Sequence, residues 1–221
     1  MAVSRTRSRK SRTPLPRARA SAEPGAGRAS ERARAATRER LRQSGLELFA
    51  ERGLHAVTTH DVAAQAGVAA GTFYLHFADK EELFRELVFE AVGELEQRFE
   101  THVHPLRGRP EAVARARAEV LLAFAEEHTG LVRLAFGRGA EGASVGADAL
   151  DHLAARLELE LCTEPDEWKA GLQPSVAAQA IVGMWARVVS WWAEAPGRAP
   201  RAAVLETMVD LQLSGIRGGP S

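Results

Sequence analysis

The chain has 221 residues, 45% of them hydrophobic, which is enough to bury a core in one large domain or two modest ones. Its 29 basic and 29 acidic side chains give a formal net charge of zero, but the two signs are separated along the sequence. Residues 1–42 hold 13 Arg and Lys against three Glu, and the remainder holds 16 basic and 26 acidic side chains. The first segment suits a polyanion such as nucleic acid, whereas the rest would repel one.

The single cysteine, Cys162, excludes an intrachain disulfide and a cysteine-rich zinc site, and it favours a reducing compartment. The basic N-terminal stretch lacks the apolar core of a secretory signal. The most apolar long run, Val176–Ala193, contains Gln179, Arg187 and Ser190 and is too short to span a bilayer. We therefore expect a cytoplasmic protein with no membrane partner, in which this run is a buried helix.

Residues 1–30 consist mainly of Arg, Ser, Ala, Pro and Gly, and such a segment cannot offset its ordering entropy by burial. We expect a disordered basic arm over residues 1–30 and a disordered tail over residues 217–221. Two interpretations of the arm stay open, a DNA-contacting arm or a merely solubilising segment. Deletion of a DNA-contacting arm would lower the affinity and flatten its salt dependence.

A helical pattern begins near residue 33, where Leu41, Gly45, Leu48 and Phe49 share one face, and it should end at Gly53. A second helix should follow at once. Thr58 with Asp61 three residues later predicts a capping box that opens it, and Gly67 ends it.

A third helix, over about residues 70–77, follows after a turn of three or four residues, which is helix-turn-helix spacing. Asp79 and Glu82 predict the cap of a long fourth helix that continues to about Phe99. Further helical stretches are expected at residues 110–128, 130–138, 147–162, 174–194 and 200–215. Because no segment alternates with period two, the predicted class is all-α, with a helix-turn-helix domain over residues 31–83 and a helical domain over residues 84–216.

Residues 58–83, TTHDVAAQAGVAAGTFYLHFADKEEL, resemble the N-terminal domain of TetR-type (tetracycline-repressor-like) transcriptional regulators. Gly67-Val68 matches the family's turn, residues 71–77 its recognition helix, and residues 79–83 the start of its fourth helix. The resemblance implies a homodimeric repressor that binds a palindromic operator in double-stranded DNA and is released by a small-molecule effector. An alternative is a non-specific DNA-binding protein that relies on the basic arm, although the acidic C-terminal half argues against it.

The resemblance assigns a set of residues to DNA. These are Thr58, Thr59, His60, Ala70, Gly71, Thr72, Tyr74, His76 and Lys80. By the same resemblance Thr59, Tyr74 and Lys80 contact phosphates, whereas His60 and residues 70–72 face the bases. His76 either reaches the DNA backbone or supports the third helix.

Phe73 and Phe77, four residues apart, are expected to pack inward. Ala69 and Ala70 depart from the family pattern, in which Ser is common at the first position and Lys, Arg or Gln at the second. Losing an N-cap hydroxyl costs about 1 kcal/mol. Few donors to bases remain, so part of the specificity is expected from DNA shape and from the arginine-rich arm in a minor groove.

In the second domain the resemblance implies an effector pocket and a dimer interface. Aromatic and flexible side chains suggest an apolar or aromatic effector contacting Phe89, Phe124, Met184 and Trp185, although these residues serve equally well as packing. The interface is expected at Val188, Trp191, Val204, Leu205, Met208 and Leu211, with a monomer core as the alternative.

His102 and His104 are interpreted as surface histidines, so no metal and no cofactor are expected. The chain is not expected to be an enzyme, because its sequence has no glycine-rich phosphate loop, nucleophile elbow or metal-ligand cluster.

Overall fold

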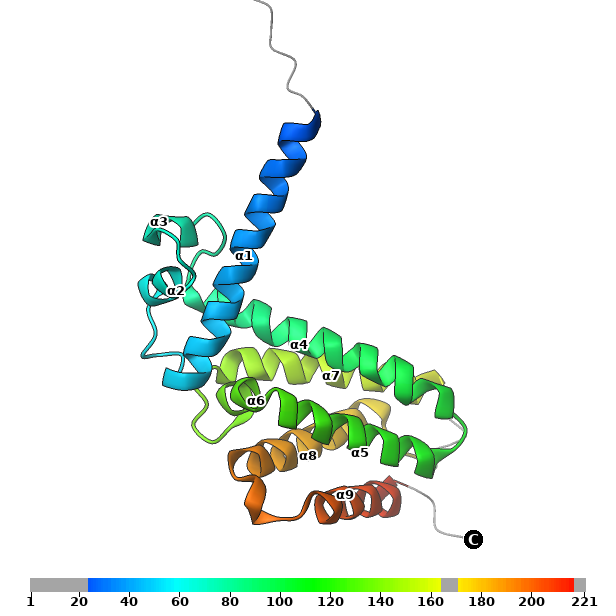
Figure 1. Cartoon of the computed structure of the whole chain (residues 1–221). Helices are drawn as coiled ribbons and strands as arrows, with labels where there is room; N and C mark the ends of the chain where they lie inside the picture. The colour runs from blue at the N-terminus through cyan, green and yellow to red at the C-terminus, as the bar shows by residue number, and fades with distance from the viewer. Residues whose placement is uncertain (1–23, 164–170, 217–221) are drawn as a thin grey trace, which may run out of the picture. The chain divides into compact units, whose positions relative to one another are not determined.

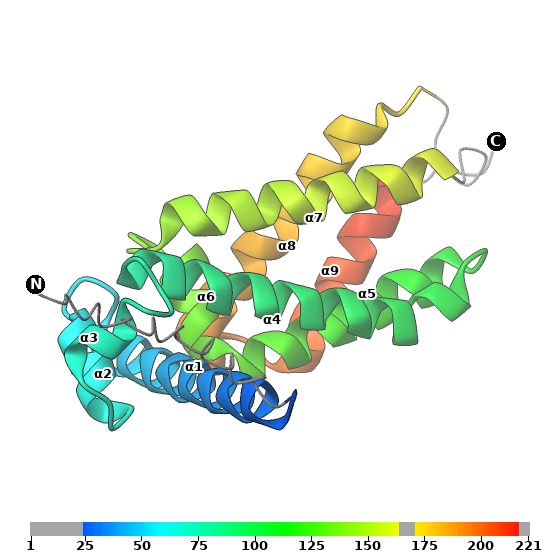
Figure 2. The same cartoon turned by 90° about the horizontal axis from the view of Figure 1, so that it is seen from above.

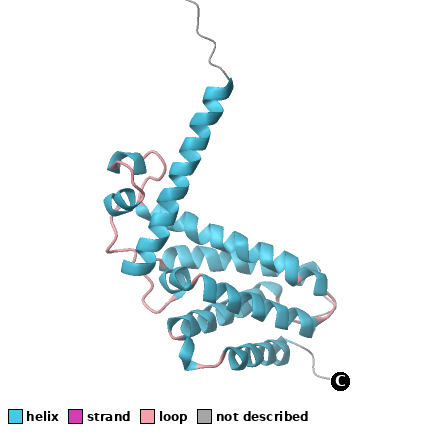
Figure 3. Ribbon diagram, in the orientation of Figure 1, coloured by secondary structure: helices cyan, strands magenta, loops and turns pink. Residues whose placement is uncertain are grey.

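The computed structural model describes residues 24–163 and 171–216, and these residues form helices without a strand (Figures 1 and 3). The predicted all-α class is therefore confirmed. The chain divides into two compact units, residues 1–36 and 37–221. The second unit contains the helix-turn-helix and the later helices, and its buried residues form one continuous core that crosses the expected boundary at residue 84.

Helix α1 spans Pro24–Arg52 and ends as predicted before Gly53, whose φ of +86° favours glycine. Its start corrects one expectation, since residues 24–30 were predicted to be disordered and are helical. Proline is tolerated in a first helical turn, and residues 28–44 contain neither Gly nor Pro but many Ala, Arg and Glu, which favour helix. The expected disorder at residues 1–23 and 217–221 lies outside the described residues.

Helix α2 spans Thr59–Gln65 and opens with the predicted capping box. The backbone N–H of Asp61 donates to Thr58 Oγ1 at 3.1 Å, and the backbone N–H of Thr58 donates to Asp61 Oδ2 at 2.9 Å. Gly67, with a φ of +68°, follows the helix as predicted. The side chain of Asp61 thus satisfies a donor that would otherwise point into solvent at the start of the motif.

Helix α3 spans only Ala70–Phe73, so the predicted extent to Phe77 is wrong. After Phe73 the chain continues in tight turns, in which the N–H of Leu75 donates to Thr72 O and the N–H of His76 donates to Phe73 O. The backbone becomes extended at Asp79, the N-cap of the next helix.

Helix α4 spans Lys80–His102 and runs three residues beyond its predicted end. Asp79 Oδ1 accepts from the backbone N–H of Glu82 at 2.7 Å, which confirms the predicted cap. Leu83, Leu87 and Leu95 are among its buried residues, and a 3-10 turn, η1 (His104–Leu106), follows. Because α4 begins beside the helix-turn-helix and extends along the later helices, it belongs to both parts of the second unit.

The remaining helices are α5 (Pro110–Glu127), α6 (Thr129–Phe136), α7 (Ala143–Thr163), α8 (Pro174–Glu194), the 3-10 turn η3 (Pro196–Arg198) and α9 (Arg201–Ile216). All five α-helices lie within a few residues of their predicted bounds. Helix α4 packs on α5 and α7, α8 packs on α5, α6 and α7, and α9 packs on α5; Figure 2 shows α4 running alongside α7. Among the helices of the described segments, none combines the length and apolarity that a bilayer crossing demands.

Helix α9 turns its apolar face inward, which corrects part of the predicted dimer interface. Val204, Leu205 and Met208 are at most 6% exposed in the single chain, so they belong to its own core and are not available to a partner. The apolar stripe of α9 is covered by α5, and the ion pair between Arg115 and Glu206 lies at the edge of that contact. Leu211 is 54% exposed, and Val188 and Trp191 are half-buried.

Candidate nucleic-acid interface

The helix-turn-helix separates its side chains into a buried face and an exposed one. Phe73 and Phe77 are at most 1% exposed and pack on each other with ring centroids 5.6 Å apart, as predicted. The predicted DNA-facing residues Thr58, His60, Ala70 and Gly71 are exposed, and Thr59, Thr72 and His76 are half-buried. Tyr74 is 59% exposed although it is a large aromatic residue.

The hydroxyl groups of Thr59 and Tyr74 lie 2.9 Å apart and form a hydrogen bond on the surface of the motif. Thr59 is the first residue of α2, and Tyr74 is the C-cap of α3. The edge of the Tyr74 ring also packs against Phe73. The sequence predicted both hydroxyls as phosphate contacts, and the structure places them side by side.

Gly71 lies on the exposed side of α3, and a Cβ atom built on it would meet no heavy atom within 4 Å. Packing inside the chain therefore does not require a glycine at this position. What the glycine provides is a bare stretch of helix backbone beside Thr72, which allows another molecule to approach closely.

Lys80 is engaged differently from the prediction. Its ammonium group donates to the carbonyl oxygens of Leu54 (2.8 Å), Val57 (2.9 Å) and His55 (3.2 Å), all in the loop between α1 and α2. An ammonium group has three N–H donors, and all three have acceptors here. The expected phosphate contact of Lys80 does not fit this geometry; the residue instead holds the loop that leads into α2.

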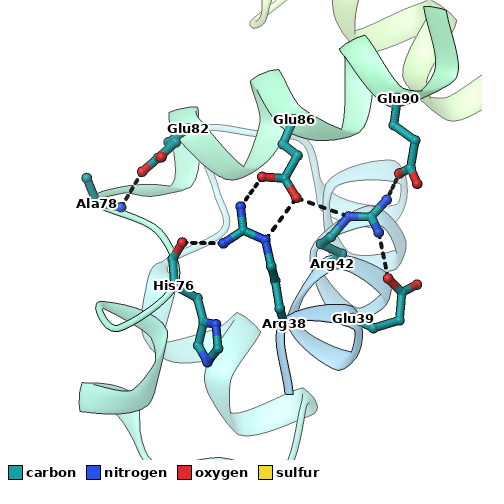
Figure 4. A network of polar contacts seen from close by, with 8 residues as sticks. All are labelled: Arg38, Glu39, Arg42, His76, Ala78, Glu82, Glu86 and Glu90. Atoms are coloured by element: carbon teal, nitrogen blue, oxygen red, sulfur yellow. Dashed lines mark hydrogen bonds and ion pairs between the residues drawn. The ribbon is translucent and has the colours of Figure 1, made fainter. Parts of the chain in front are cut away.

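A network of charged residues joins α1, the turn after α3, and α4 (Figure 4). Arg38 of α1 donates through Nη1 to the carbonyl oxygen of His76 at 2.7 Å and pairs through Nε and Nη2 with the carboxylate of Glu86. Its guanidinium carbon lies 4.3 Å from the centroid of the Phe77 ring. One turn further along α1, Arg42 pairs with Glu86 and with Glu90 of α4.

Sequence reasoning missed Arg38 and Glu86. A signal was present, because Arg38 and Arg42 are four residues apart and so are Glu86 and Glu90, which gives each helix one charged stripe. The tertiary pairing of two such stripes cannot be deduced from one helix alone.

An apolar cavity of about 120 Å³ lies among α4, α5, α6, α7 and α8. Its apolar lining includes Leu95, Phe99, Leu121, Phe124, Val132, Phe136, Leu153, Leu157, Ile181, Trp185 and Val189. The predicted ligand contacts Phe124 and Trp185 therefore line it. Phe89 and Met184 do not, which corrects the prediction, and Phe89 instead packs edge-on against His152 at 6.1 Å.

Five charged residues also line this cavity, and each of them is paired. Arg117 donates to Glu160 at 2.7 Å, and Arg156 lies 3.3 Å from both Glu96 and Glu100. The indole N–H of Trp185 donates to Gln212 Oε1 at 3.1 Å. The apolar wall is thus bordered by compensated charges, which suits a ligand that is mainly apolar.

A second cluster brings Glu94, Glu127 and His128 within 4.8 Å of one another. Arg98 donates to both carboxylates, and this pairing raises the pKa of its guanidinium above the ordinary value. Because a cation already neutralises these carboxylates, the cluster ties α4 to the junction of α5 and α6, and we assign it no ligand.

The comparisons with known proteins agree with this geometry. Residues 41–87, which contain α2, α3 and the start of α4, match the family model described as bacterial regulatory proteins, tetR family. This part of the chain is a TetR-family domain.

Two curated relatives of this chain are named as regulators. The fatty acid metabolism regulator protein of Bacillus subtilis is 26% identical over 178 residues, which cover 78% of this chain and 92% of that protein. The HTH-type transcriptional repressor KstR2 of Mycolicibacterium smegmatis is 36% identical over 76 residues, which cover 33% of this chain and 37% of that protein. The second match thus spans about a third of either chain.

Solved structures share the fold of this chain along most of its length. The fatty acid degradation regulator FadR from Bacillus halodurans superposes with a TM-score of 0.69 and 21% identity, covering 80% of this chain and 94% of that one. FadR from Bacillus subtilis in complex with stearoyl-CoA gives a TM-score of 0.67 and 24% identity over 81% of this chain and 99% of that one. The curated relatives are named as regulators, and this chain is a DNA-binding transcriptional regulator.

Proposed function

We propose that this chain is a homodimeric repressor that binds a palindromic operator in the cytoplasm and leaves it when a mainly apolar small molecule enters the cavity. The observation that carries the proposal is the exposed hydroxyl pair of Thr59 and Tyr74 beside the bare backbone of Gly71. Such a surface offers a donor to phosphate and a close approach to base edges, the two kinds of contact that a recognition helix makes.

The roles on DNA follow from exposure and chemistry. Thr59 and Tyr74 bind phosphate, while His60 and Thr72 face the bases, Gly71 allows close approach and Ala70 offers a methyl contact. Thr58 caps α2, Lys80 holds the loop that precedes it, and neither is assigned to DNA here. Residues 1–23, which carry seven Arg or Lys and one Glu, supply further phosphate contacts.

A second copy is expected to cover the exposed face of α8. Val176, Ala180, Gly183 and Arg187 share that face at spacings of three and four residues, and all are exposed in the single chain. Half-buried Val188 and Trp191 and exposed Leu211 supply further apolar surface for a partner. A two-fold interface repeats one such patch on both copies and places two recognition helices for a palindromic site.

The effector is mainly apolar because the cavity wall is apolar. A cavity of about 120 Å³ is smaller than the roughly 300–1,000 Å³ of typical ligand pockets, so a larger effector must push the lining helices apart. Leu95 and Phe99 place α4 in that wall, and α4 begins at the helix-turn-helix. Entry of a ligand therefore displaces the helix that adjoins the DNA-binding residues, which gives coupling typically worth about 1–3 kcal/mol.

Protection of the DNA upstream of the protein's own gene tests the DNA side of the proposal. We expect two protected half-sites about 34 Å apart, or a related spacing, and loss of protection on Tyr74→Ala. Protection spread evenly over the fragment would contradict sequence-specific binding.

Stearoyl-CoA, found with one relative's structure, serves as the first effector probe, with stearate and CoA alone as comparisons. Release by stearoyl-CoA and stearate but not by CoA would support an apolar ligand in the cavity. Release by CoA alone would contradict it.

A further inference from the structure

The recognition helix is too short to hold its own orientation. Helix α3 has four residues, a single turn, and isolated helices of fewer than about 12 residues are marginal in water. Its inner side is fixed by the buried rings of Phe73 and Phe77. The carbonyl groups of Thr72 and Phe73 accept from backbone N–H groups of the turns that follow, so the orientation of α3 depends on how those turns are held.

Arg38 of α1 holds the turn that follows α3. Its Nη1 donates to the carbonyl oxygen of His76 at 2.7 Å, and its planar guanidinium lies 4.3 Å from the centroid of the Phe77 ring. The two contacts are made with different groups of the turn, a backbone carbonyl in one case and an aromatic ring in the other. Together they fix both the position and the tilt of this turn.

Glu86 of α4 orients Arg38 in turn. Its two carboxylate oxygens accept from Nε and Nη2 of Arg38, which leaves Nη1 directed at His76. Arg38 and Glu86 have side chains 38% and 33% exposed, so the pair is partly shielded from solvent. A bidentate pair of this kind allows one geometry, unlike a single contact with a flexible ammonium group.

Arg42 is an arginine whose ion pairs link α1 to α4 and to its own helix. It pairs with Glu86 and Glu90 of α4 and with Glu39 of its own helix. Among the residues that the structure describes, no hydrogen bond or ion pair joins Arg42 to α3 or to the turn after it (Figure 4). The two arginines thus share one helix and one kind of partner, and they differ in the contact with His76.

We propose that Arg38, oriented by Glu86, is a positioning residue for operator recognition: it sets the orientation of α3 without touching DNA. The proposal rests on the operator binding proposed above. It predicts that replacing Arg38 weakens DNA binding through disorder of residues 70–77 and not through the absence of a phosphate contact.

The test compares Arg38→Gln, Arg38→Lys and Glu86→Gln with the control Arg42→Gln in the full chain. Amide hydrogen exchange is measured without DNA, and operator affinity is measured at several salt concentrations. We expect Arg38→Gln and Glu86→Gln to raise exchange in residues 70–77 and to lower operator affinity tenfold or more. Arg42→Gln should leave both within about twofold, and Arg38→Lys should fall between the two because its single ammonium group cannot make both contacts.

Two results would overturn the proposal. Equal effects of Arg38→Gln and Arg42→Gln on exchange and affinity would show that Arg38 only links α1 to α4, as Arg42 does. A salt slope smaller by about 0.9 for Arg38→Gln, with unchanged exchange, would make it a phosphate contact. Since hydrogen exchange needs no operator, the positioning role remains testable even if the wild-type protein proves not to prefer any sequence.

Discussion

The hydroxyl oxygens of Thr59 and Tyr74 lie 2.9 Å apart, at the start of α2 and the end of α3. Either oxygen can be the donor, and each hydroxyl carries one proton. When one hydroxyl donates to the other, only the second proton is left for an outside acceptor. The pair therefore acts as one donor toward one phosphate oxygen.

Removing one hydroxyl should cost little, because the remaining hydroxyl keeps its own proton for the phosphate. We expect Thr59→Val and Tyr74→Phe each to change operator binding by less than about threefold, and the double variant to weaken it about tenfold or more, because a hydrogen bond to a charged group contributes about 1.5–3 kcal/mol. A double-mutant cycle of binding constants measures this departure from additivity. Effects that simply add would show that the two hydroxyls contact DNA independently.

Acidification should weaken the cap of α2. The hydrogen bond from the Thr58 hydroxyl, followed by that from the Thr58 backbone, holds the pKa of Asp61 below its ordinary value of 3.8. A lowered folded pKa means that the ionised carboxylate stabilises the fold above pH 3.8 and that this contribution disappears as the pH falls through the folded pKa. We expect Asp61→Asn to lower the thermal midpoint at pH 7, and the difference from the wild type to shrink as the pH is lowered below 3.8. A difference that stays constant as the pH falls would contradict this role.

Two glycines should respond oppositely to alanine. A Cβ on Gly130 of α6 would lie 2.8 Å from the Cβ of Ala50 in α1, whereas a Cβ on Gly93 of α4 would meet nothing within 4 Å. We expect Gly130→Ala to destabilise the protein by about 1–3 kcal/mol through overpacking. Gly93→Ala should stabilise it by about 0.5–1 kcal/mol, since alanine loses less backbone entropy in a helix. Urea unfolding measures both; a neutral Gly130→Ala would show that α1 and α6 are not in close contact in solution.

Filling the cavity should block the effector and spare DNA binding. Ala186 lines the cavity, and Ala186→Leu places extra volume in it. We expect at least tenfold more stearoyl-CoA to be needed for operator release, with operator affinity unchanged within about twofold. Met184→Leu, on the same helix but outside the lining, is the control. A similarly weakened response in both variants would place the effector elsewhere.

Removal of residues 1–23 leaves α1 intact from Pro24 and deletes seven basic side chains. If these residues bind phosphates, the affinity falls and the plot of log K against log salt becomes flatter by about 0.9 for each phosphate that the shortened protein no longer neutralises. Affinities measured at four salt concentrations decide the matter. Identical affinities with and without the segment would leave it a solubilising role only.

The parts of the fold that depend on neighbours in sequence were predictable. The caps formed by Thr58 with Asp61 and by Asp79 with Glu82 use residues three apart, so the sequence contains both partners of each bond. The length of α3 was not predictable in this way. The turns that follow α3 contact Arg38, whose hydrogen bond to His76 joins residues 38 positions apart and so cannot be deduced from the local sequence.

The errors at the candidate sites share one physical origin. An apolar stripe on a helix shows that one face of the helix is covered, but it does not show which element covers that face. Val204 and Met208 were therefore placed at a dimer interface although they are buried in the single chain, where α9 packs on α5. Likewise Phe124 and Met184 are both apolar and large enough to line a pocket, and only the packing of five helices decides that one lines the cavity. Lys80 was predicted to be a phosphate ligand because the local sequence does not reveal the loop carbonyls that hold it, which lie 23 to 26 residues away.

The central claim, sequence-specific operator binding through α2 and α3, is tested most directly by one titration. Labelled DNA from upstream of the protein's own gene is bound by the full chain in the presence of excess random DNA of equal length. We predict a preference of about a thousandfold or more for one palindromic sequence, abolished by Tyr74→Ala combined with Thr72→Ala. Equal affinity for the upstream and the random DNA would contradict the account and leave the basic N-terminal residues as the main DNA contact.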